Sequence, residues 1–143
     1  MRRLRFVRLT FLLIVAGCTK STPSELAALV IRAEFRDVPS DAVACISVDG
    51  HDADIELLRA LNGIGAPVVP GSKCTYVGTP SQGSHERDSG RPAVLVDVTS
   101  HLDRDEVVYV SRHHAKWGMR VVLRVHKENG TWKIVDVVEN ESA

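Results

Sequence analysis

The sequence predicts an α+β fold, in which one or two helices pack on a curved antiparallel sheet that ends in a C-terminal β-meander. Three observations lead to this prediction. Residues 22–63 contain two stretches in which apolar side chains recur with helical spacing. Residues 92–138 instead alternate apolar and polar side chains, as half-buried strands do. The 143 residues are enough for one domain, so the helices and the sheet are expected to share one core.

The first helix is expected to begin after Thr22. Thr22 is a favourable N-cap, Pro23 suits the first helical position, and Glu25 completes a capping box. Pro39 prevents the helix from continuing further. An apolar stripe at i, i+3, i+4 and i+7 should face the sheet, and it consists of Leu26, Leu29, Val30 and Ala33.

A strand over residues 42–48 is expected next, with the Asp-Gly pair at 49–50 turning the chain after it. The stretch HDADIELLRALNG then predicts a second helix, with Asp52 as its cap and the Asn-Gly pair at 62–63 as its end. The inner side of this helix should consist of Ile55, Leu58 and Leu61.

Residues 66–74, APVVPGSKC, are extended and contain two prolines, so they form an edge strand at best. Residues 78–92 are rich in Gly, Ser and Pro without periodicity, and we expect a surface loop there. Four antiparallel strands follow, and Asn129-Gly130 is a strong signal for a hairpin between the last two. The strands are expected at residues 92–100, 105–112, 118–127 and 131–138. Their apolar face should contain Val94, Val96, Val98, Met119, Val121, Leu123 and Val125.

The start of the chain has the layout of a secretory signal. MRRLRFVR is basic, and the apolar LTFLLIVA that follows is about half as long as the ~20 residues of a membrane-spanning helix. Removing residues 1–17 leaves 14 basic and 18 acidic residues, a net charge of −4. This mildly acidic remainder has no basic stripe, which argues against a nucleic-acid partner.

The residues VAGC, Val15 to Cys18, resemble the lipobox of bacterial lipoproteins. The resemblance implies cleavage between Gly17 and Cys18, a diacylglyceryl group on the Cys18 sulfur and a palmitate-type chain on its new amino group. Two or more acyl chains hold a protein stably on a bilayer. Thr19, in place of the Asp that marks inner-membrane retention in enteric bacteria, implies the periplasmic face of the outer membrane. The alternative is ordinary signal cleavage, with Cys18 free or disulfide-bonded.

We therefore expect a signal peptide at 1–17, a lipidated N-terminus and short tether at 18–22, and one domain at 23–143. Two cysteines remain for an oxidising periplasm, and the favoured outcome is a Cys45–Cys74 disulfide. Such a bridge closes a loop of about 30 residues and is worth roughly 3 to 4 kcal/mol. Two buried free thiols or half of a metal site are the alternatives.

Resemblances to known folds are confined to short segments. NGTWKIVDV, residues 129–137, is similar to the last strands of cystatin-like and nuclear-transport-factor-like α+β rolls. CISVDGHDADIELLRAL and GSKC resemble segments of small uncharacterised proteobacterial lipoproteins. The first resemblance implies a roll, and the second implies no activity.

The histidines and serines form no recognisable catalytic or metal motif. His113 and His114 are adjacent, and the stretch SRHHAKWG favours a turn. HLDRDE, which starts at His101, lacks the spacing of an EF-hand loop, so a solvated turn is favoured over a cation site. Ser84 precedes His85 without a nucleophile elbow. We predict no catalytic residue, no metal and no cofactor.

Two acids within valine-rich strands, Asp97 and Asp136, are expected to pair with arginines such as Arg120 or Arg124 on the wet face. The tryptophans at 117 and 132 are expected to pack in or around the core.

These features predict a non-catalytic, membrane-anchored module that binds a periplasmic protein partner or a small ligand. One version is an immunity or inhibitor lipoprotein against a periplasmic effector. The alternative is a small hydrolase or isomerase with a closed pocket in the roll. Its acid and base would come from Asp97, Asp136, His101 or His113.

Overall fold

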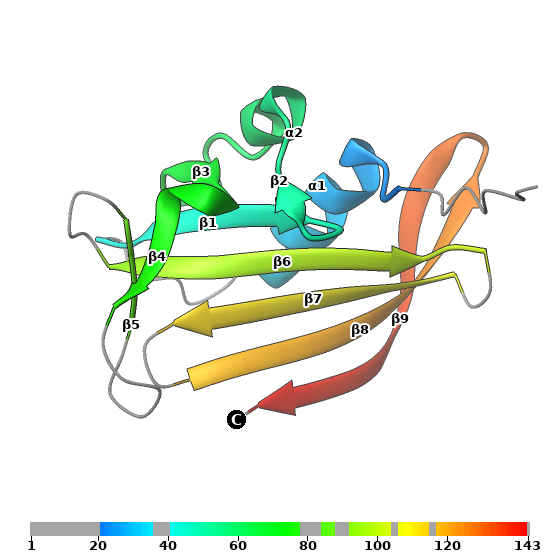
Figure 1. Cartoon of the computed structure of the whole chain (residues 1–143). Coiled ribbons are helices and arrows are strands. Elements are labelled where there is room, and N and C mark those ends of the chain that lie inside the picture. The colour runs from blue at the N-terminus through cyan, green and yellow to red at the C-terminus, as the bar shows by residue number, and fades with distance from the viewer. Residues whose placement is uncertain are drawn as a thin grey trace, which may run out of the picture.

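The structure is a computed structural model, which describes residues 21–35, 41–77, 84–87, 92–103, 106–114 and 117–142. Two helices cover one face of a seven-stranded sheet, and a separate two-stranded sheet lies at one end of the molecule (Figure 1). The α+β class is confirmed, with helices on a mostly antiparallel sheet that ends in a strand meander.

The elements follow one another in an order close to the predicted one. They are α1 (Ser24–Glu34), β1 (Val43–Val48), β2 (His51–Asp52), α2 (Ile55–Ala60), β3 (Val68–Pro70), the 3-10 helix η1 (Gly71–Lys73), β4 (Cys74–Val77), β5 (Ser84–Arg87), β6 (Ala93–His101), β7 (Val107–His114), β8 (Trp117–Glu128) and β9 (Thr131–Ser142).

The large sheet has the strand order β2-β1-β6-β7-β8-β9, and β3 also pairs with β1. The strands β6 to β9 form the predicted antiparallel meander. β1 departs from the prediction, because it lies parallel to both β6 and β3. Parallel neighbours need a long crossover connection. Residues 49–92, which contain α2, supply it between β1 and β6.

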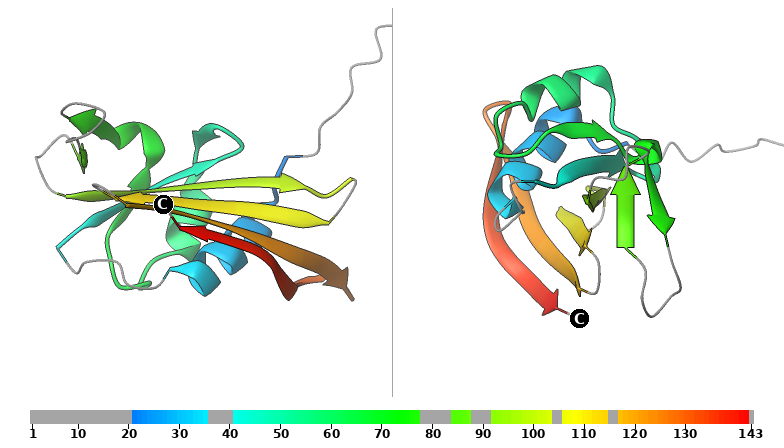
Figure 2. Two further views of the ribbon diagram at one scale, coloured as in Figure 1. Left: turned by 90° about the horizontal axis from the view of Figure 1, so that it is seen from below. Right: turned by 90° about the vertical axis from the view of Figure 1, so that its left-hand side faces the viewer.

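The core lies between the helices and the inner face of the sheet, whose strands twist around α1 (Figure 2). α1 contacts α2, β6, β7 and β9. The predicted stripe is confirmed at Leu26 and Val30, whereas Leu29 and Ala33 are only partly buried. Buried residues from the four strands β1, β6, β7 and β8 complete this side of the core: Ala44, Ile46, Val94, Val96, Val98, Val108, Val110, Val121, Leu123 and Val125.

The predicted capping box of the first helix is wrong. α1 begins at Ser24 with Pro23 as its N-cap, and no side chain caps it. The Thr22 backbone N–H donates instead to Asp49 Oδ2 at 2.6 Å, and its hydroxyl donates to Asp49 Oδ1 at 2.8 Å. Hydrogen bonds to a carboxylate are stronger than those to a neutral oxygen. Thr22 therefore fastens the chain to the end of β1 and does not cap α1.

The cap predicted for the second helix is also wrong, and its predicted inner side is confirmed at Leu61 and Leu58 but not at Ile55. Asp54 caps α2 by accepting from the Leu57 backbone N–H at 2.7 Å, while Asp52 lies in β2. The helix therefore begins two residues later than predicted, and Ile55 is its first residue. Leu57 and the predicted Leu61 are buried, whereas Ile55 is 64% exposed.

Both predicted turns form where Asp-Gly and Asn-Gly pairs occur. Asp49 and Gly50 have φ of 52° and 75° between β1 and β2, and Asn129 and Gly130 have φ of 50° and 81° between β8 and β9. Left-handed conformations at both central positions define the type I′ turn that suits a two-residue hairpin.

Two expectations for irregular segments need correction. Within the expected loop 78–92, residues 84–87 form β5, which pairs with β4; the segments 78–83 and 88–91 lie outside the described residues. The two histidines expected at a turn are the last residues of β7. His113 lies opposite Gly118, and His114 opposite Trp117.

Candidate functional site

The outer face of the sheet, opposite the helices, carries a row of polar side chains. Cross-strand register places five residues side by side on β1, β6, β7, β8 and β9. Residues directly opposite each other on neighbouring strands have their side chains on the same face. The row consists of Ser47, Asp97, Ser111, Arg120 and Glu141.

Tyr109 is the aromatic centre of this face. The His101 ring meets it edge-on, with ring centroids 5.2 Å apart. The Arg120 guanidinium lies over the same ring, 5.0 Å from its centroid, which is within the range of a cation–π contact. Arg120 therefore makes its cation–π contact with Tyr109, where the sequence had suggested an ion pair with Asp97 as one possibility.

Asp97 is less exposed than three other acidic residues of the outer face, Asp136, Glu139 and Glu141. It is partly buried, and this desolvation raises the pKa of Asp97 above its ordinary value. The negative charge of Asp49 raises the pKa of Asp97 further, and His113 partly offsets the rise.

The four acid or base candidates of the hydrolase hypothesis share this face but occupy different register positions. His101, His113 and Asp136 are exposed, and Asp97 is partly buried. Neither of the two cavities described below is lined by any of the four. In the described part of the chain they lie on an open surface, instead of in the closed pocket that the hypothesis requires.

We expect Asp97→Asn to raise the melting temperature at pH 7 by about 2 °C. A carboxyl whose pKa is higher in the folded state destabilises the fold when it is ionised. The contribution of Asp97 to the free energy of unfolding is therefore most favourable below pH ~3.8, the ordinary pKa of the group. It falls as the pH rises through the higher pKa of the folded state. Thermal unfolding at pH 3 and pH 7 measures the change.

Asp136→Asn is the matched control, because Asp136 is an exposed strand carboxylate on the same face. It should shift stability by less than about 0.5 kcal/mol at both pH values. A gain for Asp97→Asn that is equal at pH 3 and pH 7 would contradict the burial argument.

The β9 strand forms one edge of the large sheet and pairs with β8 alone among the described strands. Its register shifts twice along β8, between Val122 and Leu123 and between Arg124 and Val125. The exposed large hydrophobic residues of the described chain include three from this strand, with exposed fractions of 48 to 61%: Val135, Val137 and Val138.

Two glutamates lie near the end of the same strand. Glu139 and Glu141 are two positions apart, so their side chains leave β9 on the same side. A hydrogen bond between the two carboxyl groups raises the pKa of Glu139, and the charge of Glu141 raises it further, although Arg120 opposes the rise. The end of β9 is therefore an acidic edge.

The chain enters the domain through a second polar cluster. Thr22, fixed by Asp49, is also hydrogen-bonded through its hydroxyl to Ser100 Oγ at 2.6 Å. The Ser24 hydroxyl donates to Asp54 at 2.8 Å. A cavity of about 340 Å³ lies here between the start of α1 and the β1–β2 hairpin. The three carboxylates that line it, Asp49, Asp52 and Asp54, already accept hydrogen bonds from other residues of the chain.

A second cavity, of about 350 Å³, lies between α1 and the β8–β9 turn. Trp132 lines it together with Glu25 and Leu29, and Lys127 lies 5.3 Å from the centre of the Trp132 ring. Trp132 also packs against the core, as predicted, whereas the side chain of Trp117 lies outside the described residues.

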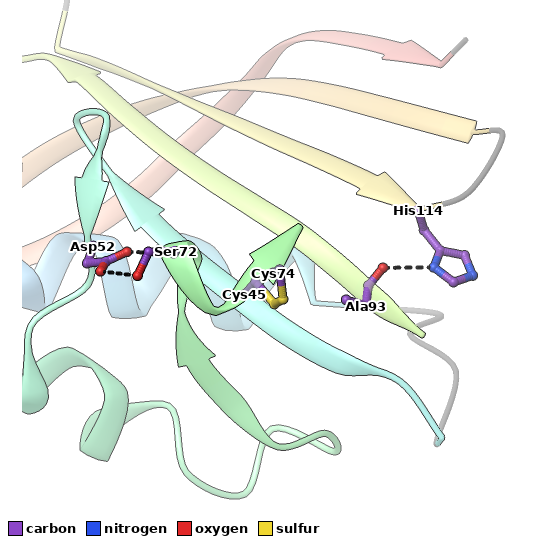
Figure 3. Close-up of a disulfide and its surroundings, with 6 residues drawn as sticks. All are labelled: Cys45, Asp52, Ser72, Cys74, Ala93 and His114. Atoms are coloured by element: carbon purple, nitrogen blue, oxygen red, sulfur yellow. Dashed lines mark hydrogen bonds between the residues drawn. A yellow bond between two sulfur atoms is a disulfide. The ribbon is translucent and has the colours of Figure 1, made fainter. Parts of the chain in front are cut away.

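The structure joins Cys45 and Cys74 in a disulfide, the pair expected from the sequence (Figure 3). Their Cα atoms are 6.2 Å apart. Cys45 is fully buried on the outer face of β1, where it packs with Val43 and Ala93. Beside the bridge, the Ser72 backbone N–H and hydroxyl both donate to Asp52, which lowers the pKa of Asp52. The bridge ties the start of β4 to β1, and the hydrogen bonds tie η1 to β2.

The lipidation and cleavage residues, Cys18 and Gly17, lie outside the described residues, as do the side chains of Ser84 and His85. Across the described ranges, no three His, Cys, Asp or Glu side chains are grouped as metal ligands would be. His101 and Glu106, from the stretch weighed as a cation site, therefore belong to no such group. No helix in these ranges is both long and apolar enough to cross a bilayer.

Two features of the candidate site were missed by the sequence analysis. The first is the Thr22 clamp, the hydrogen bonds of Thr22 to Asp49 and Ser100, whose partners lie 27 and 78 positions away and are marked by no local pattern. The open edge of β9 had a visible signal, because Val137 and Val138 are consecutive in the strand and cannot both face the core.

No family model matches the chain, and no curated protein or solved structure is detectably similar to it.

Proposed function

We propose that the chain is a lipid-anchored periplasmic module, without catalytic activity, that binds a protein partner close to the membrane surface. The single observation that carries this proposal is the Thr22 clamp. Thr22 is 7% exposed and bonded to Asp49 and Ser100, so the chain is fixed to the rest of the domain at this residue.

The clamp makes the tether short. Cys18 lies four residues before Thr22, and four extended residues span at most about 14 Å. An acylated Cys18 would therefore hold the domain against the headgroups, with little freedom to turn over. A binding surface fixed near a membrane suits a partner that is itself at or crossing that membrane.

The fold supports one end of the molecule as the end nearest the proposed anchor. The described chain enters at the end of the sheet where the β8–β9 turn lies, and β9 runs from there toward the C-terminal end (Figure 1). The cavity that Glu25 and Leu29 share with Gly130 and Thr131 places the start of α1 beside that turn. In the anchored protein, β9 would point away from the membrane.

The anchor is tested by expressing the full-length chain and its Cys18→Ser variant in a Gram-negative host. We expect the wild-type protein in the outer-membrane fraction, with a mass that shows cleavage before Cys18 and added acyl chains. The variant should lose the acyl chains and leave that fraction. An unmodified wild-type cysteine, or equal fractionation of both proteins, would contradict the anchor.

An immunity or inhibitor lipoprotein is one form of this module. The acidic, apolar edge of β9 supports it, because such an edge can cover a complementary surface of an incoming effector. Protection of the host from an effector encoded beside this chain, with loss of protection in Cys18→Ser, is the expected result.

A further inference from the structure

The outer edge of β9 has the properties of a strand-addition site. The strand is 12 residues long, and its backbone bonds are to β8 on one side only within the described chain. An uncovered edge strand presents unpaired N–H and C=O groups that another extended chain can bind. Figure 2 shows β9 and the β4–β5 hairpin on opposite sides of the molecule, so that hairpin does not cover the edge.

The side chains of this edge favour a partner that is partly apolar. Val135, Val137 and Val138 are 61%, 51% and 48% exposed. The register shifts leave Val135 and Val138 without a partner on β8. Burying such valines under an added strand removes apolar surface from water, which is the usual favourable contribution at an interface.

The charges of the edge favour a basic partner. Thr131–Ser142 contains three acidic residues and one basic residue, Lys133, which already forms an ion pair with Glu128. Near the C-terminal end of the strand, the carboxyl groups of Glu139 and Glu141 are close enough to share a hydrogen bond. A lysine or arginine from an added strand would separate and neutralise them.

The direction of β9 argues against a second copy of this chain as the occupant. Two β9 strands related by a two-fold axis would pair antiparallel across a continuous sheet. Each β9 starts at the end where its own chain enters the domain. The two short tethers would then lie at opposite ends of the dimer and could not reach one bilayer.

We propose that the free edge of β9 binds an extended segment of a partner protein in which lysine or arginine alternates with apolar residues, as an added strand of the sheet. The inference rests on the proposed function and specifies the class of its partner.

The test uses the lipidated protein in a non-ionic detergent, with two ten-residue probes, fluorescein-(Val-Lys)5-amide and fluorescein-(Val-Glu)5-amide. We expect the basic probe to bind by fluorescence anisotropy, and the acidic probe to bind at least about tenfold more weakly. Bound basic probe should slow amide hydrogen exchange within residues 131–142. Raising the salt concentration should weaken its binding.

The Glu139→Lys/Glu141→Lys variant should lose at least about tenfold in affinity for the basic probe. Glu34→Lys/Glu56→Lys, which makes the same change in net charge on the two helices, should stay within about twofold of wild type. Circular dichroism checks that both variants are folded.

Several results would overturn the inference. They are no binding of the basic probe, equal binding of the two probes, equal losses in the two double variants, or slowed exchange outside β9. A wild-type dimer in sedimentation that the β9 variant abolishes would make a second copy the occupant instead. Membrane fractionation of Cys18→Ser is independent of these results, so a failure at β9 is distinguishable from a failure of the anchor.

Discussion

Removing the Cys45–Cys74 bridge by the double substitution Cys45→Ala/Cys74→Ala should lower the free energy of unfolding by about 3 to 4 kcal/mol. The bridge joins residues 29 positions apart, so its loss frees a long loop in the unfolded chain. That loss is a large share of the free energy of unfolding of a typical domain, which is about 5 to 15 kcal/mol. Urea denaturation followed by circular dichroism measures it.

Reduced wild-type protein is the matched control, because it keeps both sulfur atoms and lacks only the cross-link. We expect it to lose nearly as much stability as the double variant, and reductant should leave the variant itself unchanged. If reduction costs little while the variant loses several kcal/mol, the packing of Cys45 against Val43 and Ala93 is the larger contribution.

Asp49→Gly should lower the free energy of unfolding by about 1 to 3 kcal/mol, the usual effect of leaving a buried donor unpaired. The substitution removes both Asp49 oxygens, so the backbone N–H of Thr22, a residue that is 7% exposed, loses its acceptor, while the Thr22 hydroxyl keeps Ser100 as a partner. Glycine tolerates the φ of 52° at this position, so backbone strain does not contribute. Denaturant unfolding measures the loss, and amide hydrogen exchange should show Thr22 losing protection.

Two further measurements identify the clamp as the cause. Asp49→Asn keeps one acceptor oxygen and also tolerates a positive φ, so its loss should be smaller than that of Asp49→Gly. Removing the Asp49 charge should also lower the pKa of Asp97, since that charge helps to raise it. Fast exchange at Thr22 in the wild-type protein would contradict the clamp.

The parts of the fold that depend on neighbouring residues were predictable from the sequence. Alternation over residues 92–138 identified the meander, because a half-buried strand exposes every second side chain. Asp49-Gly50 and Asn129-Gly130 identified two turns, the second as a hairpin, because few other pairs adopt two left-handed conformations.

The parts that depend on distant residues were not predictable. Thr22 had a local partner in Glu25, but its backbone N–H and hydroxyl both donate to Asp49, which is 27 positions away. The strand 43–48 was identified, yet nothing within it shows that its neighbour is β6 or that the two run parallel.

The site was predicted less completely than the fold. Asp97, His101, His113 and Asp136 were singled out for their residue types, and the structure places them on one open face. The edge of β9 depends on which strand ends the sheet, and only the three-dimensional order of the strands reveals it.

The parallel pairing of β1 with β6 has a consequence for the order of events during folding. Val43 meets Ala93, a residue that leaves the ribosome fifty positions later. Contacts between such distant residues form slowly, because a long loop must close before they gain any energy. The pairing of β1 with β6 should therefore form only after residues 49–92 have been made, whereas each hairpin of the β6–β9 meander can form as soon as its second strand exists.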